Sequence, residues 1–412
     1  MRRRVAITGV GVVSPIGIGK DPFWNALMEG RSGVARISSF DVTDYDCKIG
    51  AECTDFDATA YLDKKEVRRN DRFVHLAVAA ARLALEDTQL AITPQNRNRV
   101  GVVIGSGIGG AHTWEEQYDI LRTRGPSRVS PFFAPMMIVD MASGIVSIQV
   151  GARGPNFSVV SACATGGHAV GEAARIIQHG DADAMICGGS EAAITPLSLA
   201  GFCNMKALSL RNDAPARASR PFDLGRDGFV MGEGAGVVVL EAWEHAERRG
   251  ARIYAELAGY GMSADAFHIT MPDPEGDGAV VAIDMALRDA GIEPAEVGYI
   301  NAHGTSTPYN DKFETLAIKR AFGSWAPRIP VSSTKSMTAH LLGAAGGVEL
   351  ITCALAIERG MIPPTINYEV PDPACDLDYV PNTPRAATVD VAMSNAFGFG
   401  GHNAILIVRR PS

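Results

Sequence analysis

The chain has 412 residues, 46% of them hydrophobic and 20% charged, and its 38 basic against 46 acidic residues give a formal net charge of −8. This apolar content excludes an intrinsically disordered chain. The acidic balance excludes a broad nucleic-acid-binding surface, although it leaves room for a local basic patch.

The seven cysteines are scattered and form no C-x-x-C pair. This pattern disfavours a disulfide scaffold or a structural zinc site and indicates a reducing, cytoplasmic environment. The basic residues 2–4 precede an apolar run that glycine and proline interrupt, which predicts a buried strand at 5–13 rather than a signal peptide. No apolar stretch approaches the ~20 residues of a membrane span, so no membrane association is expected.

Short apolar segments rich in β-branched residues alternate with Ala-rich amphipathic segments, which indicates an α/β architecture. The predicted strands form two series, 5–13, 99–106, 157–161, 184–190 and 235–241, then 254–262, 297–301, 329–332, 391–396 and 403–409. The predicted helices are 73–87, 164–179, 277–290, 310–322 and 341–358.

The two series resemble each other in their order of elements. In each, the third strand leads through a small-residue turn, at 161–167 and at 338–344, into an Ala/Gly-rich helix. A duplicated five-stranded unit is therefore predicted, with an N-terminal half at 1–250 and a C-terminal half at 251–412. No low-complexity linker separates the halves, so a shared interface is expected.

Segment 105–110 matches the G-x-G-x-x-G pattern of dinucleotide-binding folds. Such a site also needs a following helix, a second strand and an acidic residue ~20 positions on, and no such strand follows. The glycines are interpreted instead as positions where the backbone closely approaches something such as a substrate chain.

Cys163 lies between the apolar strand end at Val159 and a helix start marked by Gly166 and Gly167. A strand–turn–helix junction exposes a side chain at the end of a sheet, as in a nucleophile elbow. We expect the helix N-terminus to lower the pKa of the Cys163 thiol and favour a thiolate. The alternative is a small buried cysteine, which is our interpretation of Cys187 and Cys353.

Two histidines occupy comparable settings in the second half. His303 follows the predicted strand 297–301, and His340 is predicted to open the helix 341–358. A helix N-terminus disfavours imidazolium, so each ring is expected to stay neutral and offer an N–H to a developing oxyanion. The alternative for either one alone is a capping or core histidine.

Lys335 and Glu349 lie near His340 in the sequence. Lys335 is predicted to end a strand, whereas Glu349 falls in a helix otherwise rich in Ala, Gly, Leu and Ile. A buried carboxylate is costly unless it is paired, so we expect a partner for Glu349.

Segment 395–403 joins the two closing strands and is rich in glycine. The glycines permit positive φ and close backbone approach. Backbone N–H groups here could complete an oxyanion hole. A tight hairpin turn explains the same residues.

Segment 63–72 contains five basic and three acidic residues, so it is locally positive in an acidic chain. A solvated helix face is the ordinary explanation. The functional alternative is a docking site for an anionic partner.

Four segments together resemble the β-ketoacyl-[acyl carrier protein] synthases, a family of thiolase-fold condensing enzymes. They are 160–165 (VSACAT), 301–307 (NAHGTST), 335–346 (KSMTAHLLGAAG) and 398–401 (GFGG). The resemblance covers essentially the whole chain and, because Ile108 is bulky, favours the synthase II group over synthase I. It implies a thiolase-like five-layer α-β-α-β-α fold built from two halves, and a homodimer.

The resemblance also implies roles for individual residues. Cys163 would be the acylated nucleophile, with His303 and His340 assisting malonyl decarboxylation. Lys335 would orient the site, with Glu349, and Phe399 would gate it while its N–H joins that of Cys163 in the oxyanion hole. The remaining implied positions are Thr305 and Thr307 at the phosphopantetheine arm, Ile108, Phe133 and Phe202 in the acyl pocket, and Lys65, Arg68, Arg69 and Lys206 at the carrier protein.

The implied reaction condenses acyl-carrier protein with malonyl-carrier protein in type II fatty acid elongation, and it requires no metal or redox cofactor. Some family members hold a structural monovalent cation, and the side chains concerned occur here as Asn301, Glu349, Ser394 and Asn395. The expected partners are an acyl carrier protein with phosphopantetheine-linked groups and a second copy of the chain, not a nucleic acid or a membrane.

Four other functions belong to related folds. A degradative thiolase would have a second catalytic cysteine in the C-terminal glycine turn, and 398–403 has none. A synthase III or chalcone synthase would have asparagine where His340 stands. A discrete polyketide ketosynthase has the same triad and stays open from sequence, whereas a non-catalytic chain-length subunit would lack Cys163.

Overall fold

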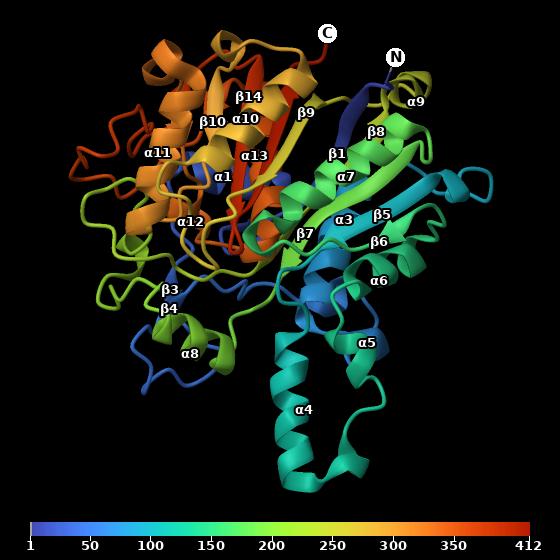
Figure 1. Ribbon diagram of the computed structural model, residues 1–412. Coiled ribbons are helices and arrows are strands. Elements are labelled where there is room, and N and C mark those ends of the chain that lie inside the picture. The colour runs from blue at the N-terminus through green and yellow to red at the C-terminus, as the bar shows by residue number, and fades with distance from the viewer. Residues whose placement is uncertain (1) are drawn as a thin grey trace.

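The computed structural model describes residues 2–412 and consists of two five-stranded halves (Figure 1). The first half contains β1 (Val5–Ser14), β5 (Val100–Gly105), β6 (Asn156–Phe157), β7 (Ala184–Glu191) and β8 (Gly234–Ala242). The second half contains β9 (Ala255–Ala264), β10 (Tyr299–Asn301), β11 (Val331–Ser332), β14 (Val391–Gly398) and β15 (His402–Arg409).

The two halves share one strand order. The continuous path is β11-β10-β14-β15-β9-β1-β8-β7-β5-β6. Each half therefore places its first strand beside its fifth, followed by its fourth, second and third. The halves meet where β1 pairs antiparallel with β9, at Ala6 and Ile7. The predicted α/β duplication is confirmed, and the predicted boundary near residue 250 falls between β8 and β9.

Helices arrange these strands into five layers. α7 (Thr165–His179) and α13 (Ala345–Arg359) pack against each other and against strands of both halves, so they form the central layer. α3 (Arg72–Thr88) packs on β1 and β8, and α10 (Asp277–Ala290), beside α11 (Pro308–Phe322), packs on β9 and β15. The order is α-β-α-β-α, as the resemblance implied.

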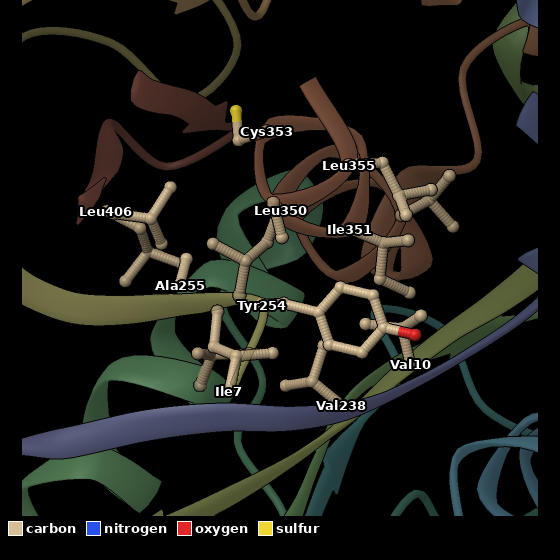
Figure 2. Packing of buried hydrophobic residues seen from close by; sticks show 14 of the residues in the cluster. Ile7, Val10, Val238, Tyr254, Ala255, Leu350, Ile351, Cys353, Leu355 and Leu406 are labelled. Carbon is tan, nitrogen blue, oxygen red and sulfur yellow. The ribbon is translucent and has the colours of Figure 1, made fainter. Parts of the chain in front are cut away.

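The central layer is buried because its side chains are apolar all round the helix. Every residue of α13 from Ala345 to Ile357 is buried. Figure 2 shows Leu350 and Ile351 of this helix over Ile7, Val10 and other side chains of the first sheet and of β9. A Cβ on Gly166 would lie 2.8 Å from the Gly347 backbone nitrogen, so only glycine lets the starts of α7 and α13 approach this closely. This contact places the turns that precede both helices side by side.

Segment 107–135 leaves the core as an arm formed by α4 (Ala111–Arg124) and α5 (Phe133–Met137), at the bottom of Figure 1. Among residues 2–412, no helix combines the length and the apolar character needed to cross a membrane. The other helices and short strands are α1 (Lys20–Met28), α2 (Lys64–Val67), α6 (Met141–Val150), α8 (Pro196–Asn204), α9 (Trp243–Arg248), α12 (Lys335–Thr338), β2 (Gly17–Ile18), β3 (Ala35–Arg36), β4 (Ile49–Gly50), β12 (Met361–Ile362) and β13 (Arg385–Ala386).

Several predicted boundaries are wrong at the ends of elements. The predicted strand 157–161 is only the two residues of β6, because the chain turns there toward Cys163. The predicted helix 341–358 starts at Ala345, because a 3-10 turn at 342–344 begins with Leu342 at a φ of 49°. Lys335 does not end a strand; it opens the short α12, three residues after β11.

Candidate active site

A cavity of about 540 Å³ lies where the central turns meet the ends of the strands. Residues from both halves line it. The predicted site residues among its lining are Ile108, Cys163, Phe202, Lys206, His303, Thr305, Thr307, His340 and Phe399.

Cys163 sits in a 3-10 turn (Ala162–Ala164) immediately before α7, and Ala162 adopts a φ of 50°. Burial raises the pKa of the Cys163 thiol to about 12, against the opposing effects of the Lys335 charge and of the nearby Phe399 N–H. The prediction that the helix N-terminus lowers this pKa is therefore wrong, because burial outweighs the favourable charges. The resting thiol is therefore protonated near neutral pH.

His303 is held by backbone contacts rather than by its position on a helix. The N–H groups of His303 and Gly304 both donate to the carboxylate of Glu314 on α11, at 2.8 Å each. Burial raises the pKa of Glu314 to about 7, against these hydrogen bonds. The sequence interpretation missed Glu314, although its spacing from Ile318 places it on the buried face of the predicted helix 310–322.

His340 lies five residues before α13, so the prediction that it opens the helix is wrong. Its N–H donates to the Val230 carbonyl at 2.9 Å, and its own carbonyl accepts the N–H of Gly232 at 2.9 Å. Its ring is nearly perpendicular to that of His303, with centroids 5.3 Å apart. Burial, then the charge of Lys335, holds the pKa of both rings well below 6.5, and both are neutral imidazoles.

Lys335 and Glu349 form an ion pair in which both side chains are buried. The expectation of a partner for Glu349 is confirmed. Burial raises the pKa of Glu349, whereas Lys335 opposes that rise. Lys335 does not line the cavity, yet its charge acts on the Cys163 thiol and on both histidines. Lys335 therefore influences the site through its charge and not by lining the cavity.

The glycine-rich segment is a tight turn, and its backbone faces the nucleophile. β14 continues to Gly398, so only residues 399–401 form the turn, with Gly400 and Gly401 at φ 86° and 74°. A Cβ on Gly398 would lie 2.5 Å from the Ser161 carbonyl oxygen and 3.1 Å from the Cys163 nitrogen. Glycine at this position therefore allows the turn to approach Cys163 closely. The tight-turn interpretation is confirmed, and the oxyanion-hole interpretation stays a prediction.

Comparison with known proteins identifies the family. The family model "Beta-ketoacyl synthase, N-terminal domain" matches residues 2–246, and "Beta-ketoacyl synthase, C-terminal domain" matches residues 254–369. The chain belongs to the β-ketoacyl synthase family. The curated "3-oxoacyl-[acyl-carrier-protein] synthase 2" of Synechocystis is 56% identical over 409 residues, covering 99% of this chain and 98% of the relative. The enzyme of the same name from Coxiella burnetii is 55% identical, covering 99% of each chain.

Solved structures share the fold of this synthase over its full length. A β-ketoacyl synthase from Burkholderia phymatum superposes with a TM-score of 0.92 at 35% identity, covering 100% of both chains. A type II polyketide ketosynthase solved in complex with its acyl carrier protein superposes with a TM-score of 0.92 at 37% identity, also covering 100% of both chains.

Some predicted residues of the synthase lie apart from the cavity. Phe133 is on α5 in the arm, edge-on to Trp114 with ring centroids 5.3 Å apart, and it does not line this chain's cavity. Lys65 and Arg68 are exposed on and just after α2, and the Arg69 guanidinium stacks 4.6 Å from the Phe132 ring centroid. Arg72, at the end of the basic segment, is paired with Glu233 and is unavailable to a partner.

The sequence interpretation did not predict the contact of Glu191 with segment 105–110, the loop with Asp265 and Thr270, or the hydrogen bond from Gly400 to this loop. The glycines of segment 105–110 approach a buried carboxylate, Glu191, rather than only a substrate chain. A loop with Asp265 and Thr270 also lines the cavity, and the Gly400 N–H donates to the Ile269 carbonyl at 2.8 Å. These contacts join segments more than 80 residues apart, so no local pattern marks them.

Proposed function

We propose that this synthase condenses acyl-carrier protein with malonyl-carrier protein, releasing CO2 and free carrier and forming 3-oxoacyl-carrier protein in fatty acid elongation. The observation that carries the proposal is the meeting of a thiol, a backbone N–H and two neutral imidazoles at one cavity. The names of the relatives at 51–56% identity support it.

The first step transfers the acyl group to Cys163. The thiol attacks the thioester carbonyl, and a neutral imidazole accepts the thiol proton and returns it to the departing carrier thiol. The N–H groups of Cys163 and Phe399 receive the developing oxyanion. A thiol pKa of about 12 requires such a base, because almost no thiolate exists at neutral pH.

The second step decarboxylates the malonyl thioester. Loss of CO2 leaves the electron pair as an enolate on the thioester oxygen, and the N–H groups of His303 and His340 stabilise that charge. The enolate carbon then attacks the acyl-Cys163 carbonyl and the carbon–sulfur bond breaks, which extends the chain by two carbons. The Cys163 sulfur leaves as a thiolate and takes up a proton from solvent. Each imidazole must be neutral, because an imidazolium would attract and stabilise the malonyl carboxylate. That carboxylate has to leave as CO2. The charge of Lys335 supports that state.

An acyl-chain series tests the proposed function. Purified synthase is incubated with malonyl-carrier protein and acyl-carrier proteins of increasing length, and the 3-oxoacyl products are measured by mass spectrometry. We expect one equivalent of CO2 for each two-carbon extension. Failure of every acyl length to give a 3-oxoacyl product would overturn the proposal.

The pH dependence of decarboxylation checks the role of Lys335. The histidines act as neutral groups, so activity is lost as the pH falls through their pKa, and the lowered values should keep the wild type active below pH 6.5. A Lys335→Met/Glu349→Gln double variant removes the cation without stranding the carboxylate. We expect its acid limb to move to higher pH, because the histidine pKa values rise. Superimposable profiles would contradict this role.

We propose that the carrier protein docks on Lys65, Arg68, Arg69 and Lys206. Carrier proteins of this pathway are acidic, and the chain itself has a net charge of −8, so docking requires a local reversal of sign. Lys206 is exposed and lines the cavity together with Thr305 and Thr307, which supports a role for it at the entry of a phosphopantetheine arm.

Reversing Arg68 and Arg69 to Glu should raise KM for carrier-linked substrates by roughly tenfold or more, since close charge pairs are worth a few kcal/mol. KM for small thioester analogues should change less than twofold. Arg288→Glu, on the exposed face of α10, is the matched control. Equal effects on both substrate classes would show that the segment is only a solvated helix face.

We also propose a structural monovalent cation beside the site. Among residues 2–412, no donor satisfies Asn301 Oδ1, Asn395 Oδ1 or Glu349 Oε2, although all three atoms are buried. Asn301 pairs with Ser394 across β10 and β14, next to Asn395. Buried oxygens without donors are costly, and a bound cation satisfies them. Such a cation would stabilise the segment that precedes His303.

We propose that the synthase works as a cytoplasmic homodimer. β6 ends the strand order, so one of its edges is unpaired, and Phe157, Ile148 and Val160 are exposed around it. A second copy would cover these apolar side chains.

All seven cysteines are free thiols, which supports a reducing compartment. The polyketide alternative is less favoured, because the type II polyketide ketosynthase of known structure is 37% identical, whereas the curated 3-oxoacyl-[acyl-carrier-protein] synthases of Synechocystis and Coxiella burnetii are 56% and 55% identical.

A further inference from the structure

Glu191, the last residue of β7, is fully buried beside the cavity and is bound by four neutral donors. The Ser106 hydroxyl donates at 2.6 Å, the Gly107 N–H at 2.8 Å, the Ile108 N–H at 3.2 Å and the Gly343 N–H at 3.0 Å. Burial raises the pKa of Glu191, and these hydrogen bonds oppose the rise. The carboxylate thus joins the Ile108 segment of the first half to the turn before α13 in the second.

The turn at Gly343 is the internal counterpart of the nucleophile turn. Each is a three-residue 3-10 turn directly before a central helix, and each begins with a non-glycine residue at positive φ, 50° for Ala162 and 49° for Leu342. Gly343 therefore corresponds to Cys163. The nucleophile turn packs on β14, the fourth strand of the second half, and the Gly343 turn packs on β7, the fourth strand of the first.

The two turns differ in what they face. At the end of β14, the Phe399 N–H faces Cys163, which leaves an anion-binding position open to a thioester oxygen. At the end of β7, the Gly343 N–H, which is the counterpart of the Cys163 N–H, donates instead to the carboxylate of Glu191. A Cβ on Gly343 would lie 2.5 Å from the Gly107 nitrogen and 2.7 Å from Glu191 Oε2, so the fit around the carboxylate is tight.

We propose that Glu191 is a positioning residue that occupies the counterpart of the oxyanion hole in the second half and thereby holds Ile108 against the acyl cavity. In this way it sets the length of acyl chain that the cavity accepts. The inference rests on the proposed function, since it assumes that the acyl group of Cys163 lies along Ile108. When the hydrogen bond from the Ile108 N–H to Glu191 is intact, the Ile108 side chain narrows the cavity. When that hydrogen bond is lost, the side chain can move and longer acyl chains can enter.

The test compares acyl lengths in a Glu191→Gln variant. An amide nitrogen would face N–H donors, so the Ile108 segment should loosen. We expect the ratio of kcat/KM for the longest to the shortest acyl-carrier protein to rise at least fivefold, while alkylation of Cys163 by iodoacetamide changes less than twofold. An unchanged ratio, with all lengths reduced equally, would overturn the proposal, because a merely structural role predicts that result.

Two further variants serve as a control for Glu191→Gln and as an independent change to the hydrogen bonds of Glu191. Glu241→Gln is the matched control: Glu241 is equally buried at the far end of β8, beside Arg249, and the acyl ratio should stay constant there. Ser106→Ala removes one of the four donors to Glu191 and should shift the ratio in the same direction by a smaller factor, even if Glu191→Gln folds poorly.

Amide hydrogen exchange separates this inference from the proposed function. In Glu191→Gln, exchange at Gly107, Ile108 and Gly343 should accelerate at least tenfold, whether or not any substrate is turned over. Unchanged exchange would overturn the positioning role. Wild-type protein that elongates no acyl chain would overturn the proposed function alone.

Discussion

Replacing Cys163 with alanine should lower condensation by roughly 10⁴- to 10⁶-fold, the scale on which removal of a nucleophile acts in enzymes. No acyl adduct should form on the protein, because no other thiol faces the Phe399 N–H in residues 2–412. Product formation from acyl- and malonyl-carrier proteins, with mass spectrometry of the intact protein, measures both effects.

Cys187→Ala is the matched control, since Cys187 is equally buried but lies in the core on β7. It should retain the acyl adduct and turn over within about twofold of the wild type. Turnover at the wild-type rate in Cys163→Ala would reject the acyl-enzyme mechanism.

Cys163→Gln should separate the two chemical steps. The glutamine amide occupies the position of the acyl thioester while His303 and His340 stay in place, so malonyl-carrier protein should still lose CO2 although condensation is lost. Release of CO2 measured without any acyl substrate checks this expectation. A variant inactive in both reactions, yet folded by circular dichroism, would mean that decarboxylation requires the thiol itself.

Replacing His303 or His340 with alanine should lower malonyl decarboxylation by about 10²- to 10³-fold each, the usual effect of losing one donor to an oxyanion, about 3–4 kcal/mol. Both rings are neutral and buried, so each N–H acts in a site from which water is largely excluded. The double variant should lose less than the product of the two single effects, because the two donors serve one oxygen.

The measurement is CO2 release in a Cys163→Gln background, where condensation cannot interfere. His245→Ala is the control, because His245 pairs with Glu241 at the far end of the sheet. Normal decarboxylation in both His303→Ala and His340→Ala would show that the enolate is stabilised by other groups.

Local sequence was enough to predict most of the architecture. Runs such as 100–104 are apolar on both faces and became central strands, and the Ala-rich segments became the helices between and around them. Element ends were predicted less well where a residue adopts positive φ without being glycine, as at Leu342 and Ala162. Such conformations depend on packing from the other half, which no window of sequence contains.

The sequence also marked Cys163, His303 and His340 as candidate site residues, and the structure brings all three to one cavity. Both histidines were correctly expected to be neutral, although burial rather than a helix N-terminus is the first cause. The ionisation of Cys163 was not predicted correctly. The pKa of Cys163 was expected to fall and instead rises to about 12, because burial by both halves outweighs the charge of Lys335. Burial depends on segments as distant as Phe399, so a local helix-dipole argument gives the wrong sign.

The sequence by itself determined the fold class and the duplication, and it marked Cys163, His303 and His340 as candidate site residues, because each of these leaves a periodic or local pattern. Only the tertiary structure decided which charges act on the nucleophile, that Phe133 lies outside this chain's cavity, and that Glu191 and Glu314 hold the site. The net charge of −8 is an example of the difference between a property of the whole sequence and a property of a local site. It describes the whole chain correctly, yet it does not describe single sites, because charges act over about 10 Å in salt and Lys65, Arg68 and Lys206 are exposed basic side chains.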